Sequence, residues 1–218
     1  MGKQQTITSP IKGHGHIFVD KLNKLIFLNI PKNASTTIRL HLKLEHILLS
    51  SIKNKEQFKT FTVLRDPYSR VISSYQEVLK CRNDAIDPKF LKTAKYFKLY
   101  QQNEVEKSFN EFLNQLEIKF FDSHVVPQKM WLGWRNINID DIHFVLNMNN
   151  GIQKEVYEMT KNLNMPIKIQ SNKRPSNQIV KSKIQNIINT NQDIKNKVYK
   201  IYQQDFELIE YCENNIWN

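Results

Sequence analysis

The chain has few cysteines, no long apolar run and fewer acidic than basic side chains. Its two cysteines, Cys81 and Cys212, show no metal-binding or redox spacing. A disulfide framework is therefore not expected, and a reducing compartment is the default. No apolar run approaches the roughly 20 residues of a membrane span, and the polar N-terminus lacks the apolar core of a signal peptide. We therefore expect a cytoplasmic protein.

Basic side chains dominate, with 32 Lys and Arg against 21 Asp and Glu, a formal net charge of +11. A positive surface favours anionic ligands such as nucleotides, acidic glycans, nucleic acids or a membrane surface. The lysines are spread along the whole chain, which is more typical of a biased composition than of one nucleic-acid-binding face. We therefore expect no specific nucleic-acid partner. Such a partner would be revealed by strongly salt-dependent affinity for DNA or RNA.

The 218 residues fit one α/β domain with enough apolar residues for a full core. Strands alternate with helices, which predicts a single domain with a central parallel sheet flanked by helices. We expect residues 1–16 to form an N-terminal arm and residues 17–218 the domain, interrupted by a helical insertion at about 82–120.

Apolar spacing predicts the individual elements. The expected strands are 25–29, 59–64, 142–146 and 166–170, and the expected helices include 35–46, one beginning at Pro67, 151–163 and a C-terminal helix. Within the insertion, Ser108 is the predicted N-cap of a helix over 109–116, with Glu111 completing a capping box.

A dense polar turn follows the first predicted strand. It contains Lys32, Asn33, Ala34, Ser35, Thr36 and Thr37. The turn is not a Walker A loop, because it has no glycine and its lysine precedes the hydroxyl residues. Main-chain N–H groups at the start of the following helix, together with the three hydroxyls, would still converge on one phosphate. Lys32 would then reach the bridging oxygen of a leaving group. The alternative is an ordinary capped helix, because Ser and Thr are common N-caps.

A second strand-to-helix junction carries Arg65 and Ser73. Arg65 ends a predicted strand, so its guanidinium would emerge at the carboxyl edge of the sheet, where α/β proteins bind ligands. Ser73 lies about two helical turns further on and would share a phosphate with Arg65. Asp66 and Arg70 would brace Arg65, cap the helix or contact that phosphate. The alternative is a surface junction with an Arg–Asp pair. Two such junctions indicate a nucleotide with phosphates at both ends.

Together the segments PKNASTT (31–37) and LRDPYSRVISSY (64–75) resemble two elements of the sulfotransferase superfamily. These enzymes use 3′-phosphoadenosine 5′-phosphosulfate (PAPS). The first segment is similar to their 5′-phosphosulfate loop, in the form found in Golgi carbohydrate sulfotransferases, including heparan sulfate 2-O-sulfotransferases. The second is similar to their 3′-phosphate element. Residues 122–128 resemble a D-x-H-x-x-P-Q segment of many of these proteins, and residues 202–211 resemble their closing helix.

The resemblance spans about residues 24–211, but the sequence shows no membrane anchor or stem and its insertion matches nothing in the family. It implies a P-loop-NTPase-like sulfotransferase fold and in-line transfer of a sulfuryl group from PAPS to a hydroxyl, most characteristically of a carbohydrate acceptor, leaving PAP. Lys32 would be catalytic, stabilising the departing phosphate. The implied cofactor-binding residues are Lys32, Asn33, Ala34, Ser35, Thr36, Thr37, Arg65, Ser73, Asn172, Lys173 and Arg174, the last three covering the adenine.

The acceptor hydroxyl must lose a proton, a task suited to a histidine or a carboxylate. His124 is the first candidate for this catalytic base, with Asp122 as its orienting partner. Alternatively, His124 is structural and braces its loop with Gln128. Weaker candidates, all expected on the first helix, are His41, Glu45 and His46. No His/Cys cluster has metal-ligand spacing, and the chemistry needs no metal.

Trp131 and Trp134 follow the His124 segment and are either packing residues or a stacking surface for a sugar ring. Two other functions remain open, because a fold does not settle function. One is a catalytically silent nucleotide- or glycan-binding module on the same fold, which would bind PAP without turnover. The other is a P-loop-like kinase or nucleotide hydrolase, which the missing Gly-rich loop and Walker B acid disfavour.

Overall fold

The computed structural model describes residues 15–79, 95–165, 167 and 177–217. The chain forms two compact units. Of the described residues, unit 1 comprises 67–79, 95–127 and 177–206, and unit 2 comprises 15–66, 128–165, 167 and 207–217. Within the described residues, no helix has both the length and the apolar character needed to cross a bilayer.

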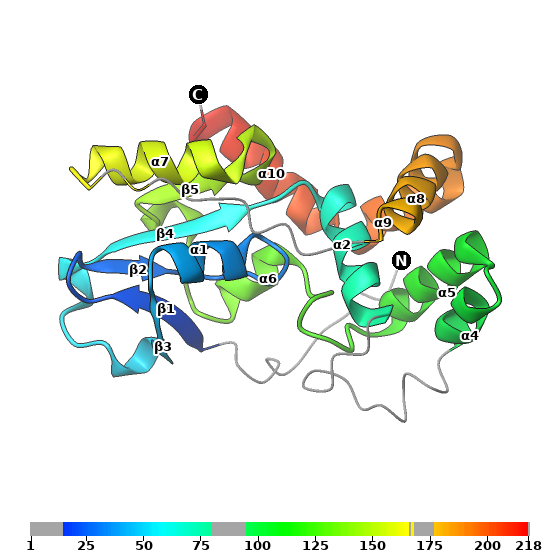
Figure 1. Cartoon of the computed structure of the whole chain (residues 1–218), viewed down its shortest axis with the longest axis horizontal. Coiled ribbons are helices and arrows are strands. Elements are labelled where there is room, and N and C mark those ends of the chain that lie inside the picture. The colour runs from blue at the N-terminus through cyan, green and yellow to red at the C-terminus, as the bar shows by residue number, and fades with distance from the viewer. Residues whose placement is uncertain (1–14, 80–94, 166, 168–176, 218) are drawn as a thin grey trace. The chain divides into compact units, whose positions relative to one another are not determined.

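A mixed sheet forms the centre of unit 2, with five strands among the described residues in the order β3-β1-β2-β4-β5 (Figure 1). The strands are β1 (His16–Asp20), β2 (Leu25–Phe27), β3 (Glu45–Leu48), β4 (Lys59–Leu64) and β5 (Phe144–Asn147). β2, β4 and β5 are parallel, with Phe27 opposite Phe61 and Val63 opposite Leu146. β1 is antiparallel to both of its neighbours.

The expected parallel pairing is thus confirmed for β2, β4 and β5 only, because β1 and β3, which were not predicted, join the sheet through the two antiparallel pairings of β1. β2 is buried along its whole length, as a parallel strand covered on both faces requires. The predicted strand at 166–170 lies almost entirely outside the described residues.

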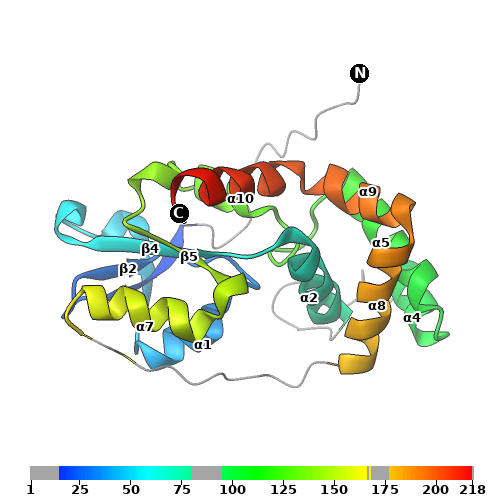
Figure 2. The same cartoon turned by 90° about the horizontal axis from the view of Figure 1, so that it is seen from above.

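Helices cover both faces of this sheet. They are α1 (Ser35–His41), α6 (Gln128–Gly133), α7 (Ile152–Asn162) and the C-terminal part of α10 (Gln203–Asn215). Figure 2 shows α1 and α7 on one face and the C-terminal part of α10 on the other. On the first face, Ile38 of α1 and Val156 of α7 pack with Phe27 and Phe61 in one fully buried cluster.

The predicted helix over residues 35–46 is wrong beyond His41. Lys43 adopts a left-handed conformation with φ of 49°. The N–H of Leu44 then donates to the carbonyl of Arg39 at 3.1 Å, which is the hydrogen bond of a Schellman ending. Residues 45 and 46 consequently lie on β3, paired with β1, and not on the helix.

Unit 1 is helical. Its helices are α2 (Pro67–Leu79), α4 (Lys95–Gln101), α5 (Val105–Ile118), α8 (Gln178–Thr190), α9 (Gln192–Ile201) and the first residues of α10. α5 packs against α4, α8 and α9, and α2 packs against α8. An aromatic cluster fills the interior, and its fully buried members are Tyr75, Tyr96, Phe109 and Phe112.

Ser108 is not the N-cap that the sequence predicts. α5 begins three residues earlier, at Val105, and Ser108 is buried inside it. The Ser108 hydroxyl donates to the carbonyl of Tyr96 at 2.6 Å and lies 2.6 Å from the hydroxyl of Tyr75. Ser108 therefore ties three elements of unit 1 together, a role that depends on tertiary packing.

Candidate functional site

The turn between β2 and α1 has an unusual backbone for a segment without glycine. Lys32 and Ala34 both have positive φ, 71° and 59°, whereas Asn33 between them does not. Each left-handed non-glycine residue costs roughly 1–2 kcal/mol, so other contacts must hold this turn. Alternation of backbone handedness aims successive N–H groups into one concavity, a nest that binds anions.

The carbonyl of Ile30 closes this turn. It accepts the N–H of Asn33 at 3.2 Å and the hydroxyl of Ser35 at 2.9 Å. α1 is only seven residues long, and no described side chain caps it, so its dipole adds little. The groups that could bind an anion here are main-chain N–H groups of the turn and the partly exposed side chains of Lys32, Thr36 and Thr37, because the Ser35 hydroxyl donates to Ile30.

Two buried amides hold the turn against the end of β4. Asn33 Nδ2 donates to the carbonyl of Val63 at 2.7 Å and to Gln128 Oε1 at 2.6 Å. Gln128 Oε1 also accepts the main-chain N–H of Arg65 at 3.0 Å, and its Nε2 donates to the Arg65 carbonyl at 2.8 Å. Neither Asn33 nor Gln128 has exposed surface. The Asn33 side chain thus braces the loop.

Arg65 reaches the same turn with its side chain. Its Nη1 donates to the carbonyl of Lys32 at 3.0 Å, and both residues are partly exposed. Two cations therefore lie next to the nest. Charge-assisted hydrogen bonds from such groups are the strongest contacts available to a phosphate or sulfate.

In unit 1, Asp122 holds His124. Asp122 Oδ1 accepts both the main-chain N–H and the ring Nδ1–H of His124, each at 2.7 Å. The Asp122 side chain has no exposed surface and the His124 side chain is 19 % exposed. The expected pairing of this histidine with Asp122 is therefore present.

Neighbouring elements fix the main chain of the same segment. Ser74 of α2 donates its hydroxyl to the carbonyl of His124 at 2.6 Å, and the Tyr202 hydroxyl donates to the carbonyl of Val125 at 2.8 Å. Three stretches singled out from the sequence thus meet within unit 1: the second motif, the 122–128 segment and the start of the C-terminal region.

Arg70, the second arginine of that motif, is buried in unit 1 with 1 % exposure. Burial lowers the pKa of Arg70, while the charges of Asp205 and Tyr202 act in the opposite direction. Asp205 is itself fully buried. Arg70 therefore serves the packing of unit 1, because its guanidinium has almost no surface to offer a phosphate.

The predicted site residues fall into two groups. Lys32, Arg65 and the turn lie together in unit 2, whereas His124 and the partly exposed Ser73 belong to unit 1. The predicted adenine-covering residues lie outside the described residues: Asn172, Lys173 and Arg174.

The weaker candidates for a base are engaged elsewhere. His41 Nδ1 lies 2.8 Å from the carbonyl of Thr37, one turn earlier in α1. Exposed Glu45 forms an ion pair with Lys21 at 2.6 Å. His46 stacks on His16 with ring centroids 4.6 Å apart. Burial, and then the neighbouring charges of His16 and Arg39, lower the pKa of His46.

Of the two tryptophans after the His124 segment, Trp131 is buried and Trp134 is partly exposed. Trp131 is 3 % exposed and packs edge-on against Trp134 at 5.7 Å. The Arg135 guanidinium lies 5.2 Å from the Trp131 ring centroid, and it also donates to the carbonyl of Asn29 at 2.9 Å. Packing is therefore the role that the structure gives Trp131.

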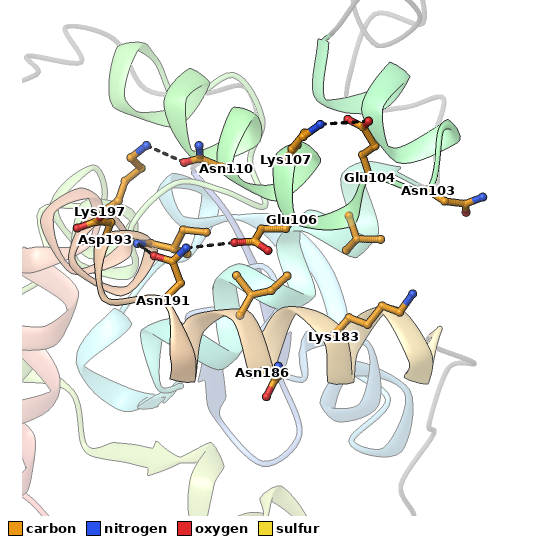
Figure 3. Close-up of a pocket in the computed structure, with 13 residues that line it drawn as sticks. Asn103, Glu104, Glu106, Lys107, Asn110, Lys183, Asn186, Asn191, Asp193 and Lys197 are labelled. Carbon is orange, nitrogen blue, oxygen red and sulfur yellow. Dashed lines mark hydrogen bonds and ion pairs between the residues drawn. The ribbon is translucent and has the colours of Figure 1, made fainter.

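A separate cavity of about 880 Å³ lies in unit 1 between α5, α8 and α9 (Figure 3). Hydrogen bonds across the helices order its wall: Lys197 Nζ donates to Asn110 Oδ1 at 2.8 Å and Asn191 Nδ2 donates to Glu106 Oε1 at 3.1 Å. Lysine, carboxylate, amide and aliphatic side chains make up its described lining. None of the predicted site residues is among them. Nor do any three His, Cys, Asp or Glu residues in the described part of the chain form a group that could hold a metal ion.

The mixed sheet defines an α/β protein, and the turn after β2 is its candidate anion site. The model of the Sulfotransferase family matches residues 15–212. The chain therefore belongs to the sulfotransferase family, and its activity is sulfuryl transfer in the general sense. This confirms the superfamily that the two motifs predict. No curated protein and no solved structure matches the chain.

Gln128 is a residue of the candidate site to which the motifs assign no cofactor role. The sequence does point to Gln128, because it is the last residue of the 122–128 segment. Its burial and its contacts with Asn33 and Arg65 arise from residues 63 to 95 positions away in the chain, which no local pattern encodes.

Proposed function

We propose that the chain transfers a sulfuryl group from PAPS to a hydroxyl of a carbohydrate acceptor, leaving PAP. The observation that carries this proposal is the glycine-free nest at Lys32–Ala34, with the Arg65 guanidinium bonded to it, in a member of the sulfotransferase family. Nest N–H groups and two adjacent cations suit a dianionic phosphate or a phosphosulfate.

The turn would hold the 5′ end of the donor. Main-chain N–H groups of the turn other than that of Asn33, which donates to Ile30, would hydrogen-bond the 5′-phosphate together with the hydroxyls of Thr36 and Thr37. The Lys32 ammonium would neutralise the charge that develops on the bridging oxygen. Sulfuryl transfer resembles phosphoryl transfer in requiring mainly positioning and charge stabilisation. The donor set of the turn fits that requirement.

The other end of the nucleotide is assigned by motif. Arg65 and Ser73 would bind the 3′-phosphate, and residues 172–174 would cover the adenine. Arg65 offers a planar fork of donors that suits a phosphate. These assignments rest on the similarity of residues 64–75 to the 3′-phosphate element.

His124 would act as the base. When bound, PAPS would supply the sulfuryl group, which passes to the acceptor oxygen as its bond to the 5′-phosphate breaks. The acceptor hydroxyl gives its proton to His124 Nε2 in that step, so the products are a sulfate ester, PAP and a protonated imidazole. Asp122 supports this role, because a carboxylate at Nδ1 stabilises the imidazolium that forms.

The carbohydrate acceptor is supported by the form of the 31–37 segment. The net charge of +11 would also favour an acidic glycan over a neutral one, since a positive field raises the local concentration of anionic substrates.

Calorimetric titration with PAP, with ATP and ADP as control nucleotides, tests the assignment of PAPS as the donor. We expect selective PAP binding that weakens by at least about 100-fold in Lys32→Ala/Arg65→Ala, because two charge-assisted contacts are lost. The matched control is Arg39→Ala/Lys53→Ala, which removes the same two charges from exposed positions of unit 2. No preference for PAP, or equal binding by the first variant, would overturn the donor assignment.

Turnover is measured separately, with labelled PAPS and a panel of glycans. Transfer to a glycan hydroxyl is the expected result. PAP binding without turnover on any acceptor would indicate the silent binding module, and a preference for ATP with phosphate transfer would indicate a kinase.

A further inference from the structure

The side-chain amide of Gln128 pairs with the main chain of Arg65 as a neighbouring strand would. β4 ends at Leu64, whose partner in β5 is Asn147, so Arg65 is the first residue beyond the strand. Gln128 accepts the Arg65 N–H at 3.0 Å and donates to its carbonyl at 2.8 Å. Both polar groups of the Arg65 main chain are thus satisfied by one side chain, which fixes the backbone that carries the guanidinium.

The same amide reaches the anion-binding turn. Gln128 Oε1 accepts one hydrogen of Asn33 Nδ2 at 2.6 Å, and the carbonyl of Val63 accepts from the same nitrogen at 2.7 Å. Both amides are fully buried. Asn33 stands between the two positive-φ residues, Lys32 and Ala34. A side chain anchored at two points here ties the strained turn to the end of β4.

We propose that Gln128 is a positioning residue that holds the anion-binding turn and Arg65 in one fixed arrangement. The inference rests on the proposed function, in which the turn binds the 5′-phosphate and Arg65 the 3′-phosphate. The Arg65–Lys32 hydrogen bond at 3.0 Å links the same two segments directly. Donors fixed before binding need no reorganisation when the ligand arrives, so affinity depends on this arrangement.

Two substitutions remove the pairing while keeping the side-chain volume. Gln128→Glu keeps the acceptor oxygen but replaces the donor Nε2 with a second oxygen, set against the carbonyl of Arg65. Gln128→Met removes every hydrogen bond. The matched control is Gln153→Glu, which makes the same chemical change at an exposed position of α7 in the same unit.

The first measurement is calorimetric titration with PAP. We expect the Kd to rise at least about tenfold in both Gln128 variants, because buried hydrogen bonds are lost, and to stay at the wild-type value in Gln153→Glu. The number of sites should remain one per folded chain. A merely structural role would lower the number of sites, through unfolding, and leave the Kd of the folded molecules unchanged. That result would overturn the proposal.

The second measurement is hydrogen exchange of the protein without nucleotide. We expect faster exchange in Gln128→Met in peptides covering residues 31–37 and 63–66, and unchanged exchange in α7. Unchanged exchange at the turn would overturn the positioning role even if PAP affinity fell. If the wild-type chain shows no preference for PAP, the donor assignment fails, and the exchange result alone decides whether Gln128 orders the turn.

Discussion

The ring Nδ1 of His124 lies 2.7 Å from Asp122 Oδ1, and the same oxygen accepts the main-chain N–H of His124. A carboxylate only accepts hydrogen bonds, so Nδ1 carries the proton of the neutral imidazole and Nε2 is left as the acceptor. The two contacts to one buried oxygen also fix the ring relative to its own backbone. In the proposed reaction, Nε2 would be the ring atom that receives the proton of the acceptor.

We predict that His124→Ala abolishes most turnover and spares nucleotide binding. Loss of a positioned base lowers a rate by about 10²–10⁴-fold, whereas no proposed contact to PAP involves this side chain. Steady-state sulfuryl transfer and PAP calorimetry on the same preparation measure both effects. His46→Ala is the matched control, an exposed histidine on β3. A kcat near that of the wild type in His124→Ala would place the base elsewhere.

Asp122→Asn tests whether the Asp122 carboxylate supports His124 as the base. The amide keeps the size of the side chain but no longer stabilises an imidazolium, and it can present its N–H₂ group to Nδ1. We expect kcat to fall by at least about tenfold with little change in the KM for PAPS. An equal loss in kcat/KM and in the folded fraction would instead show that the carboxylate is needed for folding.

Much of the sheet could be predicted from the sequence, and its edge could not. The segment at 59–64 is β4, with the predicted bounds, because its β-branched and aromatic residues Phe61, Thr62 and Val63 favour a strand. β3 was missed because three of its four residues are exposed and its partner is β1. The stop after His41 was missed because Lys43, not glycine, adopts the left-handed conformation.

In the candidate site, too, some features could be predicted from the sequence and others could not. Polar residues at the ends of strands identified the turn and Arg65, since α/β proteins bind ligands at that edge. Sequence alone left Arg70 open between bracing and binding phosphate, and only its burial decides for packing. The order that Gln128 imposes also depends on tertiary contacts, between segments far apart in the chain.

We predict that Lys43→Gly stabilises the protein. Lys43 has φ of 49° at the position where a Schellman ending favours glycine, and its side chain is exposed. Relief of left-handed strain is worth about 1 kcal/mol, partly offset by the greater freedom of glycine in the unfolded chain. Urea unfolding should therefore show a higher midpoint at the same slope.

Lys53→Gly is the control for that measurement, because it makes the same change at an exposed residue whose φ is not positive. It should be neutral or destabilising, since glycine there only adds freedom to the unfolded chain. A loss of stability in Lys43→Gly equal to that in Lys53→Gly would mean that the left-handed turn carries no strain.

We predict that Tyr75 makes the protein less stable at alkaline pH. Burial raises the pKa of Tyr75 above its ordinary value of 10.0, and its hydroxyl contacts Ser108 at 2.6 Å. Above about pH 10 the unfolded chain loses this proton and the folded chain keeps it. The unfolded state then binds fewer protons, so the free energy of unfolding falls as pH rises, by up to about 1.4 kcal/mol per pH unit for one group.

Tyr75→Phe removes this contribution. We expect the variant to be less stable than the wild type by about 1 kcal/mol near neutral pH, because the contact to Ser108 is lost, and the two stability curves to converge as the pH rises from about 9 to 11. Urea unfolding at a series of pH values measures the convergence, with Tyr199→Phe as the control at an exposed tyrosine. Parallel curves for Tyr75→Phe and the wild type would show that Tyr75 ionises equally in both states, and that its burial does not promote alkaline unfolding.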